Sequence, residues 1–210
     1  MSPSSDATPR IAAPTDERNL GREPGLVDVA VRATALGYSG ATIWLTGLPA
    51  SGKSTVAELA EQEIIGRGRP AFRIDGDNLR RGLCADLGFA PEDRAENVRR
   101  AAHAAALMTE AGVIALVALV SPYAADRDAA RALHERDGLR FLEVFVDAPV
   151  SVCASRDPKQ LYARAARGEI RDFTGVSAPY EAPVRPDLVL RTGDEPPEAS
   201  VERLIALALA

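Results

Sequence analysis

The sequence predicts an α/β fold in which a five-stranded parallel sheet is covered by helices on both faces. A length of 210 residues suits one compact domain. Five short strand-like runs stand out, each followed by a segment with helical periodicity. The runs are largely apolar throughout, which is typical of strands buried on both faces of a parallel sheet. The predicted strands are 41–46, 71–75, 113–120, 140–146 and 187–190.

The segments between these strands predict the covering helices. They are 53–67, 91–112, 122–138 and 149–166, with a last helix at 197–209 and a further helix at 25–38 that packs on the edge. In parallel sheets of this kind, ligands bind beyond the carboxyl ends of the strands. The polar clusters that follow those ends are therefore the candidates for function.

Residues 169–186 show neither helical nor strand periodicity and contain three prolines. A structureless stretch of this length inside a compact domain is usually a lid or a binding loop. The alternative is a surface linker. The aromatic residues Phe173 and Tyr180 favour the lid.

Charge and apolar content exclude two classes of partner. The chain has 25 basic and 30 acidic residues, a net charge of −5, so we expect no nucleic-acid partner, although a local basic pocket for a small anion remains possible. The longest apolar run, residues 113–120, is too short for a membrane span of about 20 residues. We therefore expect no membrane partner.

The N-terminal segment and the two cysteines give two further predictions. Residues 1–24 are rich in proline, serine, aspartate and arginine and lack the apolar run of a secretory signal, which predicts a disordered tail before a domain at 25–210. Cys84 and Cys153 form no CxxC spacing, and no His/Cys cluster suggests zinc. Two reduced thiols fit a cytoplasmic protein.

A phosphate-binding loop follows the first strand. Residues 47–54 fit the pattern G-x-x-x-x-G-K-[ST] between a strand and a helix, which is the context that this motif requires. The motif predicts that Lys53 reaches the β- and γ-phosphates and that Ser54 holds Mg²⁺. The residues expected to bind the nucleotide phosphates here are Gly47, Leu48, Pro49, Ala50, Ser51, Gly52, Lys53, Ser54 and Thr55.

Two acidic residues follow the second strand and indicate an acceptor site. The third strand runs into Ser121 and carries no acid, whereas Asp75 and Asp77 flank Gly76 after the second. One carboxylate can orient an acceptor hydroxyl group while the other orders metal-bound water. We expect Asp77 to be the acceptor-side group. The structural alternative is that Asp77 caps a helix, which does not exclude catalysis.

Basic residues close to these acids suggest a second anion site. Arg94 and Asn97 share a helix face at a spacing of three, and Arg80 precedes them on a separate short helix. Arginines placed near a phosphate loop favour bidentate recognition of an anion, although each could also lie on a solvated helix surface. Phe89 could stack on an aromatic ring or cap a small core.

Several motifs resemble the adenylylsulfate kinase family across residues 40–191. They are Asp75-Gly-Asp-Asn-Leu-Arg-Arg-Gly-Leu83, Asp86-Leu-Gly-Phe89, Asp93-Arg-Ala-Glu-Asn-Val-Arg-Arg100, Ser121-Pro-Tyr123, Glu143-Val-Phe-Val-Asp147, Arg156-Asp-Pro-Lys159, Phe173-Thr-Gly175 and Pro179-Tyr-Glu-Ala-Pro183. Some of these motifs are peculiar to that family. The resemblance implies the three-layer fold of P-loop kinases.

The resemblance also implies a reaction. The γ-phosphoryl group of ATP, with Mg²⁺, is transferred to the 3′-hydroxyl of adenosine 5′-phosphosulfate, which gives 3′-phosphoadenylylsulfate and ADP. It implies that a separate ATP sulfurylase supplies the substrate and that the kinase is a homodimer. These are expectations from the family.

The family roles transfer to particular positions of this chain. Asp77, Arg80, Arg94 and Asn97 match residues of the adenylylsulfate site, and Phe89 and Phe173 match a pair that sandwiches its adenine. Arg156 is expected near the ATP base. Ser121 matches a position regarded as phosphorylated, but direct in-line transfer is simpler, so we expect its backbone or hydroxyl group to contribute at the acceptor.

The chain departs from the family pattern in four places. Pro49-Ala50 replaces a common Ser-Gly, Ala124 replaces a frequent arginine, and Ala166-Arg167 replaces Arg-Ala. Arg171, a candidate substrate ligand, replaces the usual lysine before Phe173, which preserves charge but changes geometry. We expect these changes to affect the rate and tightness of lid closure and not the reaction.

Two other functions fit parts of the pattern. The phosphate loop and the two acids alone would suit a P-loop kinase for another small hydroxyl metabolite, but the Phe89/Phe173 pair and Arg80/Arg94 favour a nucleotide acceptor. A non-catalytic nucleotide-binding paralogue would be expected to have lost Lys53, Ser54 or Asp77, and all three are present.

Overall fold

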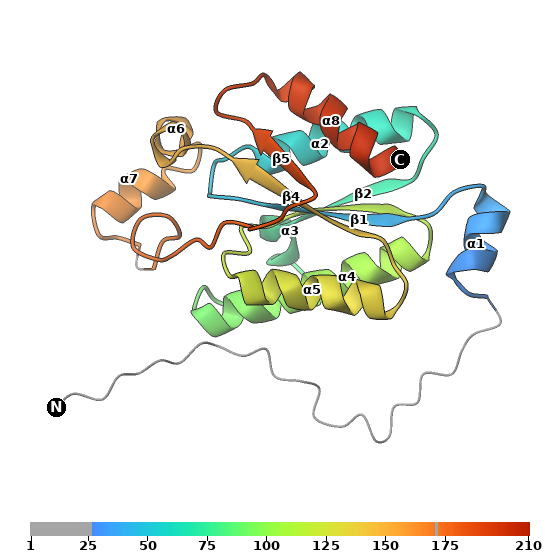
Figure 1. The fold of residues 1–210 in the computed structure, drawn as a ribbon. Coiled ribbons are helices and arrows are strands. Elements are labelled where there is room, and N and C mark those ends of the chain that lie inside the picture. The colour runs from blue at the N-terminus through green and yellow to red at the C-terminus, as the bar shows by residue number, and fades with distance from the viewer. Residues whose placement is uncertain (1–26, 171) are drawn as a thin grey trace.

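The computed structural model describes residues 27–170 and 172–210, which form a parallel sheet between two layers of helices (Figure 1). The strand order is β2-β3-β1-β4-β5 and every pair is parallel. The strands are β1 (Ala41–Thr46), β2 (Ala71–Asp75), β3 (Ile114–Ala118), β4 (Phe141–Asp147) and β5 (Leu188–Arg191). The predicted five-stranded parallel sheet is thus confirmed. The predicted tail at 1–24 and Arg171 lie outside the described residues.

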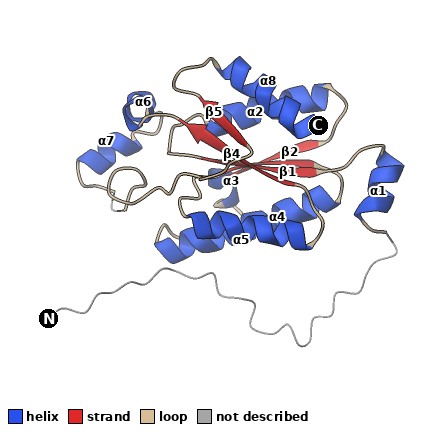
Figure 2. Cartoon of the chain, viewed as in Figure 1, coloured by secondary structure: helices blue, strands red, loops and turns tan. Residues whose placement is uncertain are grey.

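Helices cover both faces of the sheet, as Figure 2 shows. α2 (Lys53–Gly66) and α8 (Pro197–Leu209) pack together on one face, and α4 (Pro91–Glu110) and α5 (Ala124–Arg136) pack together on the other. The short helices α3 (Gly76–Leu79), α6 (Val150–Arg156) and α7 (Leu161–Ala166) lie at or near the carboxyl ends of the strands, and α1 (Val29–Leu36) lies beyond the opposite ends. This placement leaves the carboxyl edge open for a site.

The central strand β1 explains why its sequence is apolar throughout. All six of its residues are buried. Ile43 and Leu45 belong to the core beneath α2 and α8, whereas Trp44 belongs to the core beneath α4 and α5. Successive side chains of a strand point to opposite faces, so a strand that is covered on both faces has no solvent-facing positions. Within the described part of the chain, no helix combines the length and apolar composition needed to cross a membrane.

The prediction of one helix over 149–166 is wrong. The chain forms α6 and α7, which are separated by Asp157–Gln160. Pro158 disfavours helical backbone in the residue before it, and Asp157 has φ of 9°. The Asp157 carboxylate accepts hydrogen bonds from the backbone N–H groups of Leu161 (2.7 Å) and Ala163 (3.1 Å). This aspartate therefore starts a second helix instead of continuing the first.

Several other boundaries differ from the sequence prediction by a few residues, among them the end of β3 and the limits of α1. β3 ends at Ala118 and not at residue 120, because the following residues leave the sheet at the carboxyl edge. The helix predicted at 25–38 is α1, which ends at Gly37 in the left-handed conformation (φ 77°). That conformation is a common helix C-cap and strongly favours glycine.

Candidate active site

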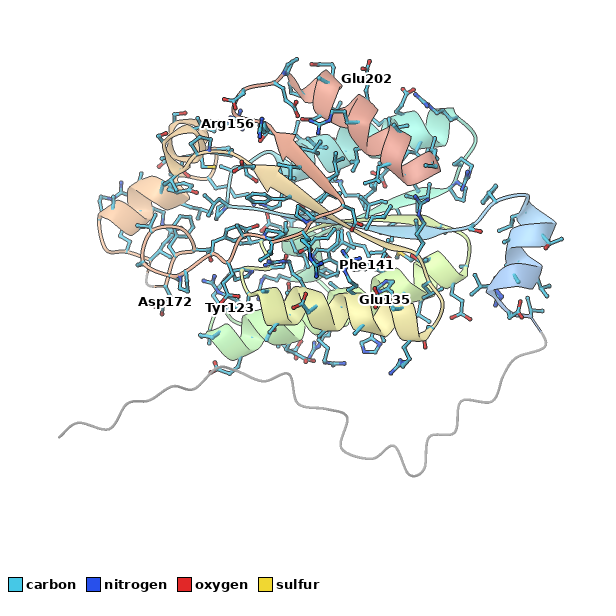
Figure 3. All side chains as sticks on the ribbon, viewed as in Figure 1. Tyr123, Glu135, Phe141, Arg156, Asp172 and Glu202 are labelled. Atoms are coloured by element: carbon cyan, nitrogen blue, oxygen red, sulfur yellow. The ribbon has the colours of Figure 1, made fainter. Side chains whose placement is uncertain are left out.

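A cavity of about 1130 Å³ lies at the carboxyl edge of the sheet. Its walls come from the phosphate loop, the segment from α3 to the start of α4, the residues after β3, the α6–α7 region and the lid. Arg156 lies near the upper part of this end of the molecule and Asp172 near its lower part (Figure 3). The cavity lining confirms that the polar residues that follow the strand ends lie together at this edge of the sheet.

The phosphate loop owes its shape to three residues with positive φ. These are Gly47 (156°), Ala50 (60°) and Gly52 (100°). A Cβ atom on Gly47 would lie 2.4 Å from the Val146 carbonyl oxygen, so only glycine fits there. Thr192, just after β5, donates its hydroxyl hydrogen to the Ser51 carbonyl oxygen at 2.6 Å. The loop is therefore fixed by its own turns and by a neighbouring strand end.

Lys53 is buried in this loop. Its Nζ donates to the carbonyl oxygens of Leu48 (2.7 Å) and Gly47 (3.0 Å). Burial lowers its pKa from 10.5 to about 8, and the nearby Cys153 and Asp75 oppose that shift. An ammonium group is therefore retained at neutral pH in a place where little water screens it. Such a group attracts phosphate oxygens strongly.

Ser54 and Asp75 meet beside the phosphate loop. The Ser54 hydroxyl donates to Asp75 Oδ2 at 2.7 Å, and Asp75 Oδ1 accepts from the Asp77 backbone N–H at 3.0 Å. Asp75 thus caps α3, and the suggestion that Asp77 is the capping residue is wrong. Two hard oxygen groups at the cavity wall suit Mg²⁺, which typically takes one or two protein ligands besides phosphate and water.

Asp77 projects into the cavity with 61% of its side chain exposed and forms an ion pair with Lys159. Lys159 comes from the loop between α6 and α7. It was not among the candidate site residues, although the Arg156–Lys159 motif contains it. The pair joins the two sides of the cavity across 82 residues of sequence.

Arg80 packs against Phe89 on the acceptor side. The guanidinium carbon lies 4.4 Å from the centre of the ring, and Nη1 donates to the carbonyl oxygen of Leu87 at 3.1 Å. Phe89 is 70% exposed and lines the cavity. The alternative in which Phe89 caps a small core is therefore wrong, and most of the residue stays exposed at the cavity wall beside Arg80.

Arg94 joins the Phe89 segment to the lid. Its Nε donates to the Phe89 carbonyl oxygen (2.9 Å), Nη1 to Thr174 Oγ1 (2.7 Å) and Nη2 to the Asp172 carbonyl oxygen (2.7 Å). The alternative of a solvated surface arginine does not hold. Phe173 lies between the two lid residues that Arg94 contacts. Because the Phe89 segment and the Phe173 segment are bonded to the same guanidinium, their relative position is defined.

Asn97 and Phe173 complete this side. Asn97 is 6% exposed and lines the cavity, and its Nδ2 has no hydrogen-bond partner. A buried amide donor without a partner is costly, which indicates a place for a ligand acceptor. Phe173 is 7% exposed and packs edge-to-face on Tyr162, with ring centres 4.9 Å apart. It belongs both to a small core and to the cavity wall.

Ser121 lines the cavity, but its hydroxyl group is engaged. Ser121 Oγ accepts a hydrogen bond from Trp44 Nε1 at 3.1 Å, and the residue is 3% exposed. Its backbone has φ of 37°. These contacts favour the expected supporting contribution over a covalent one.

The donor side ends at Arg156, which lines the cavity and donates to the Thr192 carbonyl oxygen. The cavity wall includes most of the sequence-predicted site residues: Pro49, Ala50, Gly52, Lys53, Ser54, Thr55, Asp75, Asp77, Arg80, Phe89, Arg94, Asn97, Ser121, Arg156 and Phe173. Gly47, Leu48 and Ser51 belong to the phosphate loop but do not line the cavity. Arg171 is outside the described residues.

The lid segment packs on the phosphate loop. A Cβ atom on Gly175, whose φ is 85°, would lie 2.6 Å from Leu48 Cδ2. Tyr180 shares a hydrogen bond of 3.1 Å with Thr46 and stacks on Phe145. These contacts contradict the surface-linker alternative.

The cavity differs from the whole chain in charge. Eight basic residues in the described wall face four acidic ones, although the chain carries a net charge of −5. The basic residues are Lys53, Arg73, Arg80, Arg81, Arg94, Arg156, Lys159 and Arg164, and the acidic ones are Asp75, Asp77, Asp157 and Glu195. The site therefore favours polyanionic small molecules.

Comparison with known proteins agrees with this geometry. The family described as Adenylylsulphate kinase matches residues 39–191. An adenylyl-sulfate kinase of Shewanella amazonensis is 50% identical over 174 residues, which cover 83% of this chain and 87% of that protein. One from Saccharomyces cerevisiae is 53% identical over 153 residues, 73% of this chain and 76% of the other.

A solved structure gives the same result in three dimensions. The Mycobacterium tuberculosis APS kinase CysC, in complex with AMPPNP and APS, superposes with a TM-score of 0.78 at 48% identity and covers 80% of this chain and 97% of that one. The chain therefore belongs to the adenylylsulfate kinase family of ATP-dependent phosphotransferases.

Proposed function

We propose that this chain transfers the γ-phosphoryl group of ATP to the 3′-hydroxyl of adenosine 5′-phosphosulfate (APS), giving 3′-phosphoadenylylsulfate and ADP. One observation carries the proposal. A single cavity joins a phosphate loop that holds a buried lysine to a second wall with an exposed aromatic ring, two arginines and the unpartnered Asn97 amide. The second wall suits a nucleotide acceptor better than a small apolar one.

On the donor side, Lys53 and the amides of the phosphate loop bind the β- and γ-phosphates of ATP. Phosphoryl transfer involves little covalent chemistry for the protein, so catalysis depends on positioning and on charge stabilisation. Ser54, with Asp75 beside it, would hold Mg²⁺, which neutralises charge on the phosphate oxygens when it is bound. Arg156 also lines the cavity and is assigned to the ATP base.

On the acceptor side, Asp77 orients the 3′-hydroxyl group and accepts its proton. Phe89 and Phe173 hold the adenine by stacking, and Arg80, Arg94 and Asn97 bind the polar part of APS. Arg94 is bonded to the lid and to the Phe89 carbonyl oxygen. We therefore assign it to lid closure as well as to substrate binding.

The lid at 169–186, in which we include Arg171, closes over the reacting groups and excludes water. We also propose that APS is supplied by a separate ATP sulfurylase and that the protein is a cytoplasmic homodimer. Analytical ultracentrifugation of the purified chain tests the oligomeric state, and a dimer is the expected result.

The reaction is tested by supplying candidate acceptors to the purified protein with MgATP. ADP formation should depend on APS. Turnover with a sugar acid or a nucleoside and no stimulation by APS would refute the proposal. Absence of turnover with every acceptor would favour a non-catalytic nucleotide-binding protein.

The role of Asp77 is tested by Asp77→Asn. This variant should lower kcat at least 100-fold while the Kd for ATP, measured by calorimetry, changes less than threefold. Asp128→Asn is the matched control because Asp128 is exposed on α5 and does not line the cavity. Equal loss of ATP binding and turnover in Asp77→Asn would contradict the assignment.

A further inference from the structure

We infer that Arg127, which does not line the cavity, is the positioning residue that fixes the acceptor wall and the lid in one arrangement. The inference rests on the proposed function, because its kinetic readout is the affinity for APS. Arg127 lies on α5 and is 2% exposed. It was not among the residues that the sequence motifs pointed to.

The Arg127 guanidinium group binds three segments at once. Nε donates to Glu143 Oε1 on β4 at 2.6 Å, Nη1 to the Ser121 carbonyl oxygen at 2.7 Å and Nη2 to the Glu181 carbonyl oxygen at 2.7 Å. Glu143 anchors the group to the sheet. The other two acceptors belong to the cavity wall after β3 and to the carboxyl end of the lid.

The Ser121 contact matters because the backbone there is strained. Ser121 has φ of 37°, a conformation that non-glycine residues keep only when their surroundings fix it. Trp44 holds the hydroxyl oxygen at 3.1 Å, and Arg127 holds the carbonyl oxygen. The hydrogen bond from the charged Arg127 guanidinium is stronger than the one from the neutral Trp44 indole. Arg127 therefore keeps this wall of the acceptor site in place.

The Glu181 contact fixes the carboxyl end of the lid. The Glu181 backbone N–H donates to the Pro122 carbonyl oxygen at 2.8 Å, and its carboxylate accepts from the Ala124 N–H at 2.7 Å. Arg127 adds the bond to the Glu181 carbonyl oxygen. The lid end is thus joined to the segment that carries Ser121. Movement of either one is restrained by the same guanidinium.

A planar fork is required for this arrangement. Arginine presents donors in fixed directions, whereas lysine is a point charge on a flexible stem. Arg131, one turn further along α5, is the matched control. Its Nη2 donates to Asp187 at 2.8 Å and lies 3.9 Å from Glu143, and its guanidinium lies over Phe141. It shares the Glu143 neighbour but lies on the side away from the cavity.

The test compares two variants, with and without Arg127, in which the Glu143 carboxylate has been replaced. Glu143→Gln keeps an oxygen acceptor for Nε and leaves the contacts with Ser121 and Glu181 in place. Arg127→Met combined with Glu143→Gln removes those contacts without leaving a buried carboxylate uncompensated, which is what makes single removal of a buried ion-pair partner destabilising. Arg131→Met is the surface control.

The expected result is a selective loss at the acceptor. Relative to Glu143→Gln, the double variant should raise the KM for APS at least tenfold while the KM for ATP stays within twofold. The Arg131→Met protein should keep both values within twofold of the wild type. An equal rise in both KM values, or an unchanged KM for APS in a folded double variant, would overturn the inference.

Hydrogen exchange separates this inference from the proposed reaction. If the wild-type protein does not phosphorylate APS, the proposed function fails, but the exchange experiment still applies. The Glu181 amide proton, which is bonded to the Pro122 carbonyl oxygen, should exchange at least tenfold faster in the double variant than in Glu143→Gln, with those of α2 unchanged. Unchanged exchange at Glu181 would refute the positioning role by itself.

Discussion

The donor and acceptor ends of the cavity are built in opposite ways. The donor end is made mainly by one continuous segment, and the bonds of Lys53 span only five or six residues. At the acceptor end, Arg94 bonds across 80 residues to Thr174, and Lys159 pairs with Asp77 across 82. One end is a local motif and the other exists only in the folded chain.

This difference separates binding of ATP from recognition of APS. A short loop fixed by its own turns keeps its shape when more distant segments move. An acceptor wall assembled from α3, α4, the residues after β3 and the lid depends on every connection among them. We therefore expect substitutions in the phosphate loop to leave APS binding intact, and substitutions of buried residues in the acceptor wall to change APS affinity and stability together.

The largest effect is expected at Lys53. Lys53→Met should lower kcat about 10³-fold, because a preorganised cation at the transferred phosphoryl group is lost. Steady-state ADP formation measures the rate, and calorimetry measures APS binding. The Kd for APS should stay within threefold of the wild type. A large loss of APS affinity would break the separation between the two ends.

Phe89 and Phe173 differ in burial, so their substitution should affect the free energy of unfolding to different extents. Phe173→Ala should lower the free energy of unfolding by about 3 kcal/mol, because Phe173 is buried against Tyr162. Phe89→Ala should change it by less than about 0.5 kcal/mol, because Phe89 is 70% exposed.

Both aromatic substitutions should raise the KM for APS about tenfold through lost stacking. Urea denaturation and steady-state kinetics provide the two readouts. If Phe89→Ala is destabilised as much as Phe173→Ala, the exposed position of Phe89 is incorrect.

Asp126 reveals an electrostatic cost behind the acceptor end. The residue is 2% exposed, and its Oδ2 has no hydrogen-bond partner. Burial raises its pKa from 3.8 to about 6, and Arg127 opposes that shift. Because the folded pKa lies above the unfolded value, the buried carboxyl group carries no ionisation cost below about pH 4. The protein loses stability as the pH rises from there through 6, where the buried group ionises.

Asp126→Asn should therefore raise the free energy of unfolding by about 2 kcal/mol at pH 7.5, and the difference should disappear below pH 4. Thermal or urea unfolding at several pH values checks this, with the exposed neighbour Asp128→Asn as control. A pH-independent difference would show that the carboxyl group does not titrate as described.

The smallest effect is expected at Ala50 in the phosphate loop. Its φ of 60° costs an L-residue about 1 kcal/mol. Glycine relieves that strain but loses about 0.4–1 kcal/mol through the entropy of the unfolded chain. Ala50→Gly should thus stabilise the protein by no more than about 0.5 kcal/mol, with the KM for ATP unchanged.

Ala129→Gly provides the contrast, because Ala129 is exposed inside the helix α5 and has no backbone strain to relieve. That variant should be less stable than the wild type by about 0.5–1 kcal/mol. Destabilisation by both substitutions would show that the left-handed conformation of the loop is not strained.

Prediction from sequence succeeded where contacts are local. The five strands, the phosphate loop and the acids after β2 could be located because periodicity and short motifs report on neighbouring residues. The break between α6 and α7 was missed, although Pro158 gave a signal for it. Lys159 could have been found from its motif. Nothing in the single sequence pointed to Arg127, because its three partners are up to 54 residues away.

The sequence by itself determined the α/β class, the parallel sheet and the phosphate loop, because apolar strand runs, helical periodicity and glycine positions report on local backbone geometry. Only the tertiary structure decided that Asp77 pairs with Lys159 and that Arg127 and Arg94 hold the lid. Those contacts depend on where distant chain segments meet. The same holds for charge: a chain with a net charge of −5 forms a cavity in which basic residues outnumber acidic ones, because folding brings scattered arginines to one edge of the sheet.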